Sequence, residues 1–297
     1  MKEKRVPRIA RIAGALAAAF MAFSACSPQH EATYSPPPPT PTIGASRSGE
    51  ILTKTNQQII EQEVKRLGIN YSVFEQQLWP IFHNDISSMT NEQKINEAQK
   101  RAATAIINME KSENPYFQEV ARDFKQFLRT DMLSIRLVPG PLIISSEKAL
   151  AGMGTDIEIR NGKLHRLIVV DANLLLENPH LVEIALQFTH EIQHTKNSIG
   201  FEKSLSPSLS VNQKLYLELQ RPRNQDNVVV EEADAHGVEA QAYIHAYGLG
   251  FYQKPKLQYQ ILAGVFIRSG ANPESQAWKK AVAQEFLGIQ NWQPEEN

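Results

Sequence analysis

The spacing of apolar residues predicts amphipathic helices between residues 51 and 128, where apolar positions recur at intervals of three and four. Asn114 followed by Pro115 predicts the start of one helix, because Asn caps helix N-termini and Pro is favoured in the first helical position. This stretch contains no cluster of ligand-type residues. We interpret residues 51–128 as a helical N-terminal scaffold, and the pattern leaves open whether it is a separate domain or a lid.

Alternating apolar and polar residues replace the helical spacing farther along the chain, in runs at 135–139, 156–160 and 164–170. Asn161 and Gly162 join the last two runs. Asn-Gly is typical of a type I′ turn, in which both central residues need positive φ. The sequence therefore predicts a β-hairpin within a small sheet.

The segment after the hairpin predicts a long helix, with Asn178 as its N-cap and Pro179 in its first position. The residues of this helix separate into two faces. The apolar face consists of Leu181, Ala185, Phe188 and Ile192, and the polar face consists of Glu183, Gln187, His190 and His194. We expect the polar face to border a cleft.

A second polar helix is predicted at residues 227–247, ended by Gly248 and Gly250. The overall expectation is an α+β fold that is mostly helical. It has a small β-sheet before the first long helix and a second ligand-bearing helix after it.

His190, Glu191 and His194 form the pattern HExxH on the first long helix. Residues four apart lie about one turn from each other, so both imidazoles can reach one zinc ion with Glu191 beside its open position. Two surface histidines on a solvated helix face are the simpler interpretation of so short a pattern. Zinc also needs a third protein ligand, which must come from elsewhere in the chain.

The position of the third ligand separates the known HExxH classes. The extended metzincin pattern requires Gly at position 197 and His at position 200. The chain has Asn197 and Gly200, which excludes that class. The second polar helix instead offers Glu232 at the start of an E-x-x-A-H segment.

With this segment the chain resembles the gluzincin metallopeptidases, over about residues 156–247. The resemblance implies that His190, His194 and Glu232 bind Zn²⁺ and that Glu191 is the catalytic base. In this family a sheet edge beside the HExxH helix pairs with an extended peptide, which suits a peptide substrate. The pattern does not tell which strand forms that edge.

The chain departs from the family at His236, where an aspartate often hydrogen-bonds a ligand histidine. His236 is therefore a candidate catalytic residue, either as a donor to the tetrahedral intermediate or as an orienter of a ligand. Glu231 is the alternative third ligand, because Asp234 would then be placed to accept the hydrogen bond of a ligand histidine.

Glu239 and Tyr243 lie on the same helical face as Glu232 and His236. Tyr243 is a second candidate donor to the intermediate. The alternative is that Glu239 and Tyr243 only border the core.

The resemblance implies that residues 129–297 form a zincin-like metallopeptidase domain that hydrolyses peptide bonds of peptides or proteins. The competing hypothesis is a non-catalytic scaffold or binding module with a structural or vestigial metal site. The presence of Glu191 argues against this non-catalytic hypothesis, because a purely structural zinc site has no need of a carboxylate at that position.

The N-terminal residues predict export. A basic segment precedes an apolar run at 12–23 that is too short to span a bilayer comfortably, as in a signal peptide. Cys26, the only cysteine, follows this run and resembles the lipobox of bacterial lipoproteins, although Phe23 stands where Leu is usual. We expect a signal peptide at 1–25 and a lipid anchor at Cys26, the alternative being an ordinary secretory signal.

Residues 26–50 are rich in Pro, Ser and Thr, which predicts an extended tether between the lipid and the folded chain. Without residues 1–25, which carry five of the 31 basic and one of the 32 acidic residues, the formal net charge changes from −1 to −5. A mildly acidic domain has no broad attraction for nucleic acid, so we expect no such partner. The expected location is the bacterial cell envelope, on the exported side of a membrane.

Lipidation can be tested on the mature protein. We expect mass spectrometry of the N-terminal peptide to find an acylated Cys26, because the basic segment, short apolar run and cysteine occur in lipoprotein order. A protein that still begins at Met1 would contradict the lipoprotein interpretation.

Overall fold

The computed structural model describes residues 45–82, 86–140, 142–143, 150–151, 153–221, 224–250 and 257–293. The predicted signal peptide, Cys26 and most of the predicted tether lie outside these residues. The first helix begins at Ala45, inside the segment 26–50 that the composition predicts as tether.

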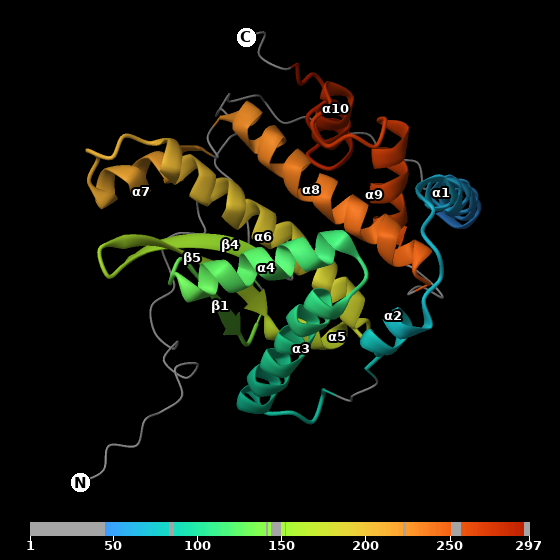
Figure 1. Ribbon diagram of the computed structural model, residues 1–297, viewed down its shortest axis with the longest axis horizontal. Coiled ribbons are helices and arrows are strands. Elements are labelled where there is room, and N and C mark those ends of the chain that lie inside the picture. Colours follow the sequence, from blue (N-terminus) through green and yellow to red (C-terminus); the bar gives the residue numbers. More distant parts are fainter. Residues whose placement is uncertain are drawn as a thin grey trace, which may run out of the picture.

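The chain forms helices around one small sheet (Figure 1). The predicted α+β class, mostly helical and with the sheet before the HExxH helix, is confirmed. The helices are α1 Ala45–Leu67, α2 Val73–Leu78, α3 Asn91–Lys111, α4 Pro115–Arg129, α5 Ala172–Glu177, α6 Leu181–Ser204, α7 Val211–Gln220, α8 Gln225–Gly248, α9 Leu257–Arg268 and α10 Gln276–Glu285. The strands are β1 Leu133–Val138, β2 Leu142–Ile143, β3 Leu150–Ala151, β4 Met153–Arg160 and β5 Lys163–Asp171.

The main sheet has the strand order β1-β5-β4, with β5 parallel to β1 and antiparallel to β4. Asn161 and Gly162 join β4 to β5 with φ angles of 52° and 73°, so the predicted hairpin is confirmed. Within the described residues β4 pairs only with β5, which places β4 at one edge of the sheet. The two-residue strands β2 and β3 form a separate antiparallel pair.

The predicted start of the HExxH helix is wrong. Asn178 is the C-cap of the short helix α5, and α6 begins at Leu181 with His180 as its N-cap. The reason is that Asp171 caps an earlier helix, because its carboxylate accepts the backbone N–H groups of residues 173 and 174. The carbonyl of Pro179 accepts the backbone N–H of Phe82, which holds this connection extended instead of helical.

The N-terminal helices pack directly against the HExxH helix. Phe117 and Phe124 of α4 belong to the same hydrophobic cluster as Phe188 and Ile192 of α6. Arg101 of α3 is 1% exposed, and its guanidinium donates to the carbonyls of residues 176 and 178, just before α6. Residues 51–128 and the later part of the chain therefore share one core.

A buried arginine fixes the sheet against α6. The Arg166 guanidinium on β5 donates to the Ser198 hydroxyl at 3.0 Å and to the Glu202 carboxylate at 2.6 Å. Both partners lie on α6, so β5 and the helix that carries HExxH are held in one orientation.

The C-terminal helices cover α8 close to its polar residues. The indole N–H of Trp278 on α10 donates to the Ala233 carbonyl at 2.7 Å, and Trp278 is fully buried. Gly237, one turn farther along α8, lies so close to Pro273 that an added Cβ would be 2.6 Å from the Pro273 Cβ. The glycine thus permits the close contact between α8 and the C-terminal segment.

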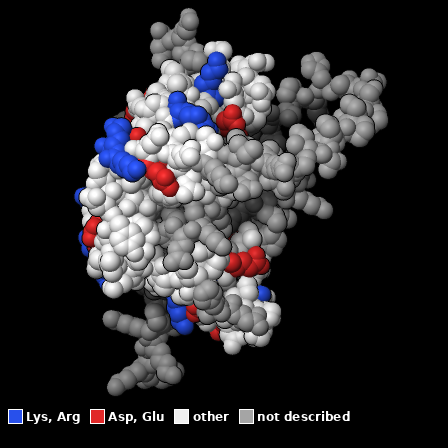
Figure 2. Space-filling model, turned by 90° about the vertical axis from the view of Figure 1, so that its right-hand side faces the viewer, with Lys and Arg blue, Asp and Glu red and all other residues white. Residues whose placement is uncertain are grey.

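The molecular surface mixes charged and uncharged side chains on the face that Figure 2 shows, with acidic and basic groups next to one another in its upper part. Among the described residues, no helix is both long and apolar enough to cross a membrane.

The contact at Gly237 generates a stability prediction with an internal control. We expect Gly237→Ala to lower the free energy of unfolding by about 1–3 kcal/mol, because the added methyl overpacks the interface with Pro273. Gly200→Ala on α6 is the control, since its Cβ would meet nothing within 4 Å. It should stabilise by up to about 1 kcal/mol through helix propensity. Urea denaturation measures both, and equal effects would contradict the proposed overpacking.

Candidate metal centre

The polar faces of α6 and α8 lie against each other. The predicted apolar stripe of α6 is confirmed, since Leu181, Ala185, Phe188 and Ile192 are at most 1% exposed. Glu183, on the predicted polar face, is also buried. The side chains of His190 and His194 keep only 15% and 16% of their surface accessible. The histidines are therefore mostly buried between the helices and do not lie on an open helix face.

The two histidines of HExxH point their rings at the same place. His190 Nε2 and His194 Nε2 are 3.0 Å apart, and the ring centroids are separated by 4.7 Å. In the neutral form each imidazole has one nitrogen with a lone pair and one with a proton. Two nitrogens at this separation need either a shared proton or a cation between them.

Glu232 of α8 reaches both of these nitrogens. Its carboxylate oxygens lie 3.5 Å from His190 Nε2 and 3.6 Å from His194 Nε2. The alternative ligand Glu231 is turned away and forms an ion pair with Arg221. Asp234, its proposed partner, accepts a hydrogen bond from Asn197 at 3.4 Å. The structure therefore brings Glu232, and not Glu231, to the histidine pair.

The three donor groups fit a zinc ion in kind and spacing. Zinc bonds of about 2.0–2.1 Å in a tetrahedron place neighbouring ligand atoms about 3.3 Å apart. The two histidine nitrogens are 3.0 Å apart, and Glu232 approaches them with different oxygens, Oε2 at 3.5 Å from His190 Nε2 and Oε1 at 3.6 Å from His194 Nε2. All the donor atoms lie within 4.8 Å of one another. Two neutral imidazoles and a carboxylate are a common ligand set of catalytic zinc.

Glu191 is held by the edge strand of the sheet. The Thr155 hydroxyl on β4 donates to Glu191 Oε2 at 2.6 Å, and Glu191 is 9% exposed. This contact spans 36 residues and depends on the register that places Thr155 opposite Ile168. No sequence motif indicates Thr155, so the sequence analysis missed it.

His236 lies beside the cluster of His190, His194 and Glu232 but is not one of these three candidate ligands. Its Nε2 is 3.7 Å from a Glu232 oxygen, and its ring centroid is 4.5 Å from that of His190. The ring of Phe286 packs on His236, with centroids 5.0 Å apart. Its side chain is 21% exposed, so part of the ring is accessible to solvent.

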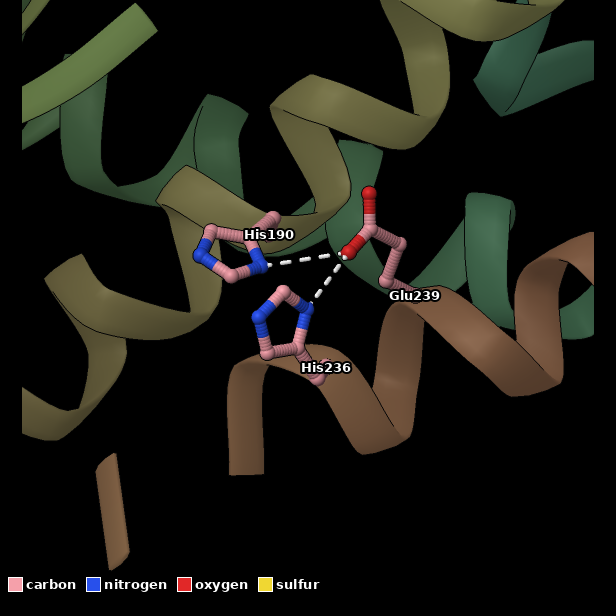
Figure 3. Close-up of side chains that lie close together, drawn as sticks. All are labelled: His190, His236 and Glu239. Carbon is pink, nitrogen blue, oxygen red and sulfur yellow. Dashed lines mark hydrogen bonds and ion pairs between the residues drawn. The ribbon is translucent and has the colours of Figure 1, made fainter. Parts of the chain in front are cut away.

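Glu239 links two histidines, as Figure 3 shows. One oxygen, Oε2, lies 3.3 Å from His190 Nδ1 and 3.0 Å from His236 Nδ1. Tyr243, the other residue of this helical face, is fully buried in the hydrophobic core. Glu239 therefore contacts both histidines, whereas Tyr243 packs in the hydrophobic core.

The cluster is electrostatically coupled. Burial opposes ionisation of Glu232, but the charges of His194 and His190 hold the pKa of this carboxyl well below its ordinary value. Burial opposes ionisation of Glu239 as well, yet its hydrogen bonds with His190 and His236 lower its pKa to about 2. Burial also opposes protonation of His190, while its hydrogen bonds with the two carboxylates raise the His190 pKa well above the ordinary value.

The His194 pKa is lowered, first by burial and further by the neighbouring His190 charge, although the Glu232 carboxylate opposes the shift. The lowered pKa values of Glu232 and Glu239 keep negative charge beside the histidines, which favours a cation at this position.

Comparisons of the chain with known protein families, with curated proteins and with solved structures give no match. The geometry of the site is therefore the basis for a functional assignment.

Proposed function

We propose that this protein is a zinc-dependent peptidase of the gluzincin type, with a zincin-like arrangement of α6 and α8. The observation that carries the proposal is the approach of Glu232 to both histidines of HExxH, at 3.5 and 3.6 Å. Two surface histidines on a solvated helix would not have a partly buried carboxylate from another helix beside both of them.

His190, His194 and Glu232 would hold the ion. Three protein ligands leave a fourth position for substrate or water, as in catalytic zinc sites. When bound, zinc polarises a carbonyl group and lowers the pKa of water toward neutrality.

Glu191 is the proposed general base. It accepts the proton of the attacking water and returns it to the nitrogen of the leaving amine, so that a C–O bond forms as the C–N bond breaks. The hydrogen bond from Thr155 occupies one oxygen, Oε2, and keeps the other available for this proton. This placement supports a catalytic role and speaks against a structural metal site.

His236 is the proposed donor to the developing oxyanion. It is the imidazole next to the ligand set that remains partly exposed, at 21%. Its Nδ1 lies 3.0 Å from Glu239 Oε2, so Nε2 is the nitrogen that would donate to the oxyanion.

The edge strand β4 supports a peptide substrate. It pairs only with β5 within the described residues, and its residue Thr155 contacts the proposed base. An extended peptide can add to such an edge through backbone hydrogen bonds, which brings a peptide bond close to Glu191. We propose peptides or proteins of the bacterial cell envelope as substrates, with the enzyme tethered through Cys26.

The third ligand can be tested by metal content. Glu232→Gln should weaken zinc binding by at least about tenfold, because it replaces the anionic ligand that reaches both histidines. Glu231→Gln is the matched control from the adjacent position, and it should keep zinc because Glu231 pairs with Arg221. Zinc stoichiometry after dialysis distinguishes the two, and loss of zinc only from Glu231→Gln would transfer the ligand role.

The catalytic role of Glu191 can be tested separately from metal binding. We expect Glu191→Gln to keep the fold and the zinc and to lower peptide hydrolysis by about a hundredfold or more, since the base is lost but the size is kept. Zinc content, melting temperature and cleavage of a mixed peptide library measure the three properties.

An inactive wild type with zinc bound, or a Glu191→Gln variant that cleaves equally well, would leave the hydrolase proposal without support. The protein would then be assigned as a scaffold or binding module with a structural metal site.

A further inference from the structure

We propose that Glu239 is a positioning residue that orients both a metal ligand, His190, and the proposed donor, His236, through a single carboxylate oxygen. The inference rests on the proposed function and assigns a role to a residue outside the HExxH and E-x-x-A-H motifs. Glu239 contacts neither the proposed ion nor substrate directly, so its effects reach the reaction through the two histidines.

The contacts carry this assignment. Glu239 Oε2 is 3.3 Å from His190 Nδ1 and 3.0 Å from His236 Nδ1, and the three residues come from α6 and α8 (Figure 3). The Glu239 side chain is 9% exposed, against 21% for His236. A carboxylate is acceptor-only when ionised, so both imidazoles must present Nδ1–H to it.

The tautomer of His190 follows from this contact. With the proton on Nδ1, the lone pair of His190 is on Nε2, the atom that lies 3.0 Å from His194 Nε2 and 3.5 Å from Glu232. A carboxylate behind a histidine in this way orients the ring and increases its basicity toward a metal. Glu239 therefore selects the nitrogen that the three-ligand set requires.

A second metal site is the competing interpretation of the same atoms. His190, His236 and Glu239 also present donor atoms within 4.8 Å of one another. A neutral imidazole has only one lone pair, so His190 can serve the set with His194 or the set with Glu239, but not both. The first set contains both histidines of HExxH with their Nε2 atoms 3.0 Å apart, whereas the two Glu239 contacts have hydrogen-bond lengths of 3.3 and 3.0 Å. We therefore assign Glu239 as a hydrogen-bond acceptor.

Because one Glu239 oxygen contacts both histidines, we expect a Glu239 substitution to have two effects that can be measured separately. Through His190, Glu239 supports zinc affinity. Through His236, it supports turnover at saturating zinc. Replacing Glu239 should impair both properties, whereas replacing His236 should impair only turnover. In a His236→Ala background, a Glu239 substitution should still weaken zinc binding and should no longer lower the turnover number.

The experiment is a double-mutant cycle with Glu239→Gln and His236→Ala in the full-length protein. We expect Glu239→Gln to weaken zinc affinity by about 10- to 100-fold, measured by competition with a chelator. His236→Ala should leave zinc affinity within about threefold, because its ring is not a ligand. Asp234→Asn is the control, since Asp234 is a carboxylate of α8 that contacts Asn197 and no histidine. It should change neither zinc affinity nor turnover.

Two readouts keep the test independent of activity. Nitrogen NMR of the imidazoles should show Nδ1 of His236 protonated in wild type and a changed Nδ1 signal in Glu239→Gln. If wild type hydrolyses no peptide, the proposed function fails. The measured zinc affinity and the NMR signal of His236 would still test the role of Glu239. Should Glu239→Gln unfold, Glu239→Asp keeps the charge with a shorter reach and should still weaken zinc binding.

Two results would overturn the inference. One is a folded Glu239 variant with wild-type zinc affinity. The other is a stoichiometry of two zinc ions per wild-type chain with one lost in Glu239→Gln, which would establish the second metal site.

Discussion

The close approach of α6 and α8 is the constraint on which the site depends. It places two imidazole nitrogens 3.0 Å apart with a carboxylate oxygen near each, on side chains that are mostly buried. The nitrogen lone pairs and the carboxylate oxygens repel one another unless positive charge lies between the rings. The helices must therefore be held together by contacts outside the cluster, because the donor groups without a cation or proton would push them apart.

Those contacts surround the cluster on several sides. Arg166 ties β5 to α6, Arg101 fixes the chain just before α6, and Trp278 anchors the C-terminal segment on α8. These are buried hydrogen bonds to backbone or to charged partners, which hold orientation more strictly than apolar packing alone. The first of them acts through the sheet, which also supplies Thr155 to Glu191. The scaffold contacts and the proposed chemistry thus share α6, α8 and the adjacent strands β4 and β5.

Local signals predicted the elements well where one residue type dominates the backbone conformation. Asn161-Gly162 forms the expected turn, and Asn114 caps α4 as expected. Asn178 failed as a cap because Asp171 starts a separate short helix before it, and Pro179 bonds to a distant backbone N–H. A hydrogen bond between residues so far apart in the sequence cannot be predicted from local residue preferences. The helix α7 carried a capping box at Ser210 and Gln213 that the sequence analysis did not use.

For the site, HExxH and the following polar helix determined which residue types were available, and helical periodicity placed His236 and Glu239 on the face of Glu232. Periodicity could not choose between Glu231 and Glu232, because adjacent helical residues differ by about 100° and the direction of the partner helix is unknown from one chain segment. The packing of α8 on α6 brings Glu232 to the histidines and leaves Glu231 paired with Arg221. It also made Glu239 a contact of two histidines and Thr155 a partner of Glu191, since each of these contacts depends on how separate elements meet in space.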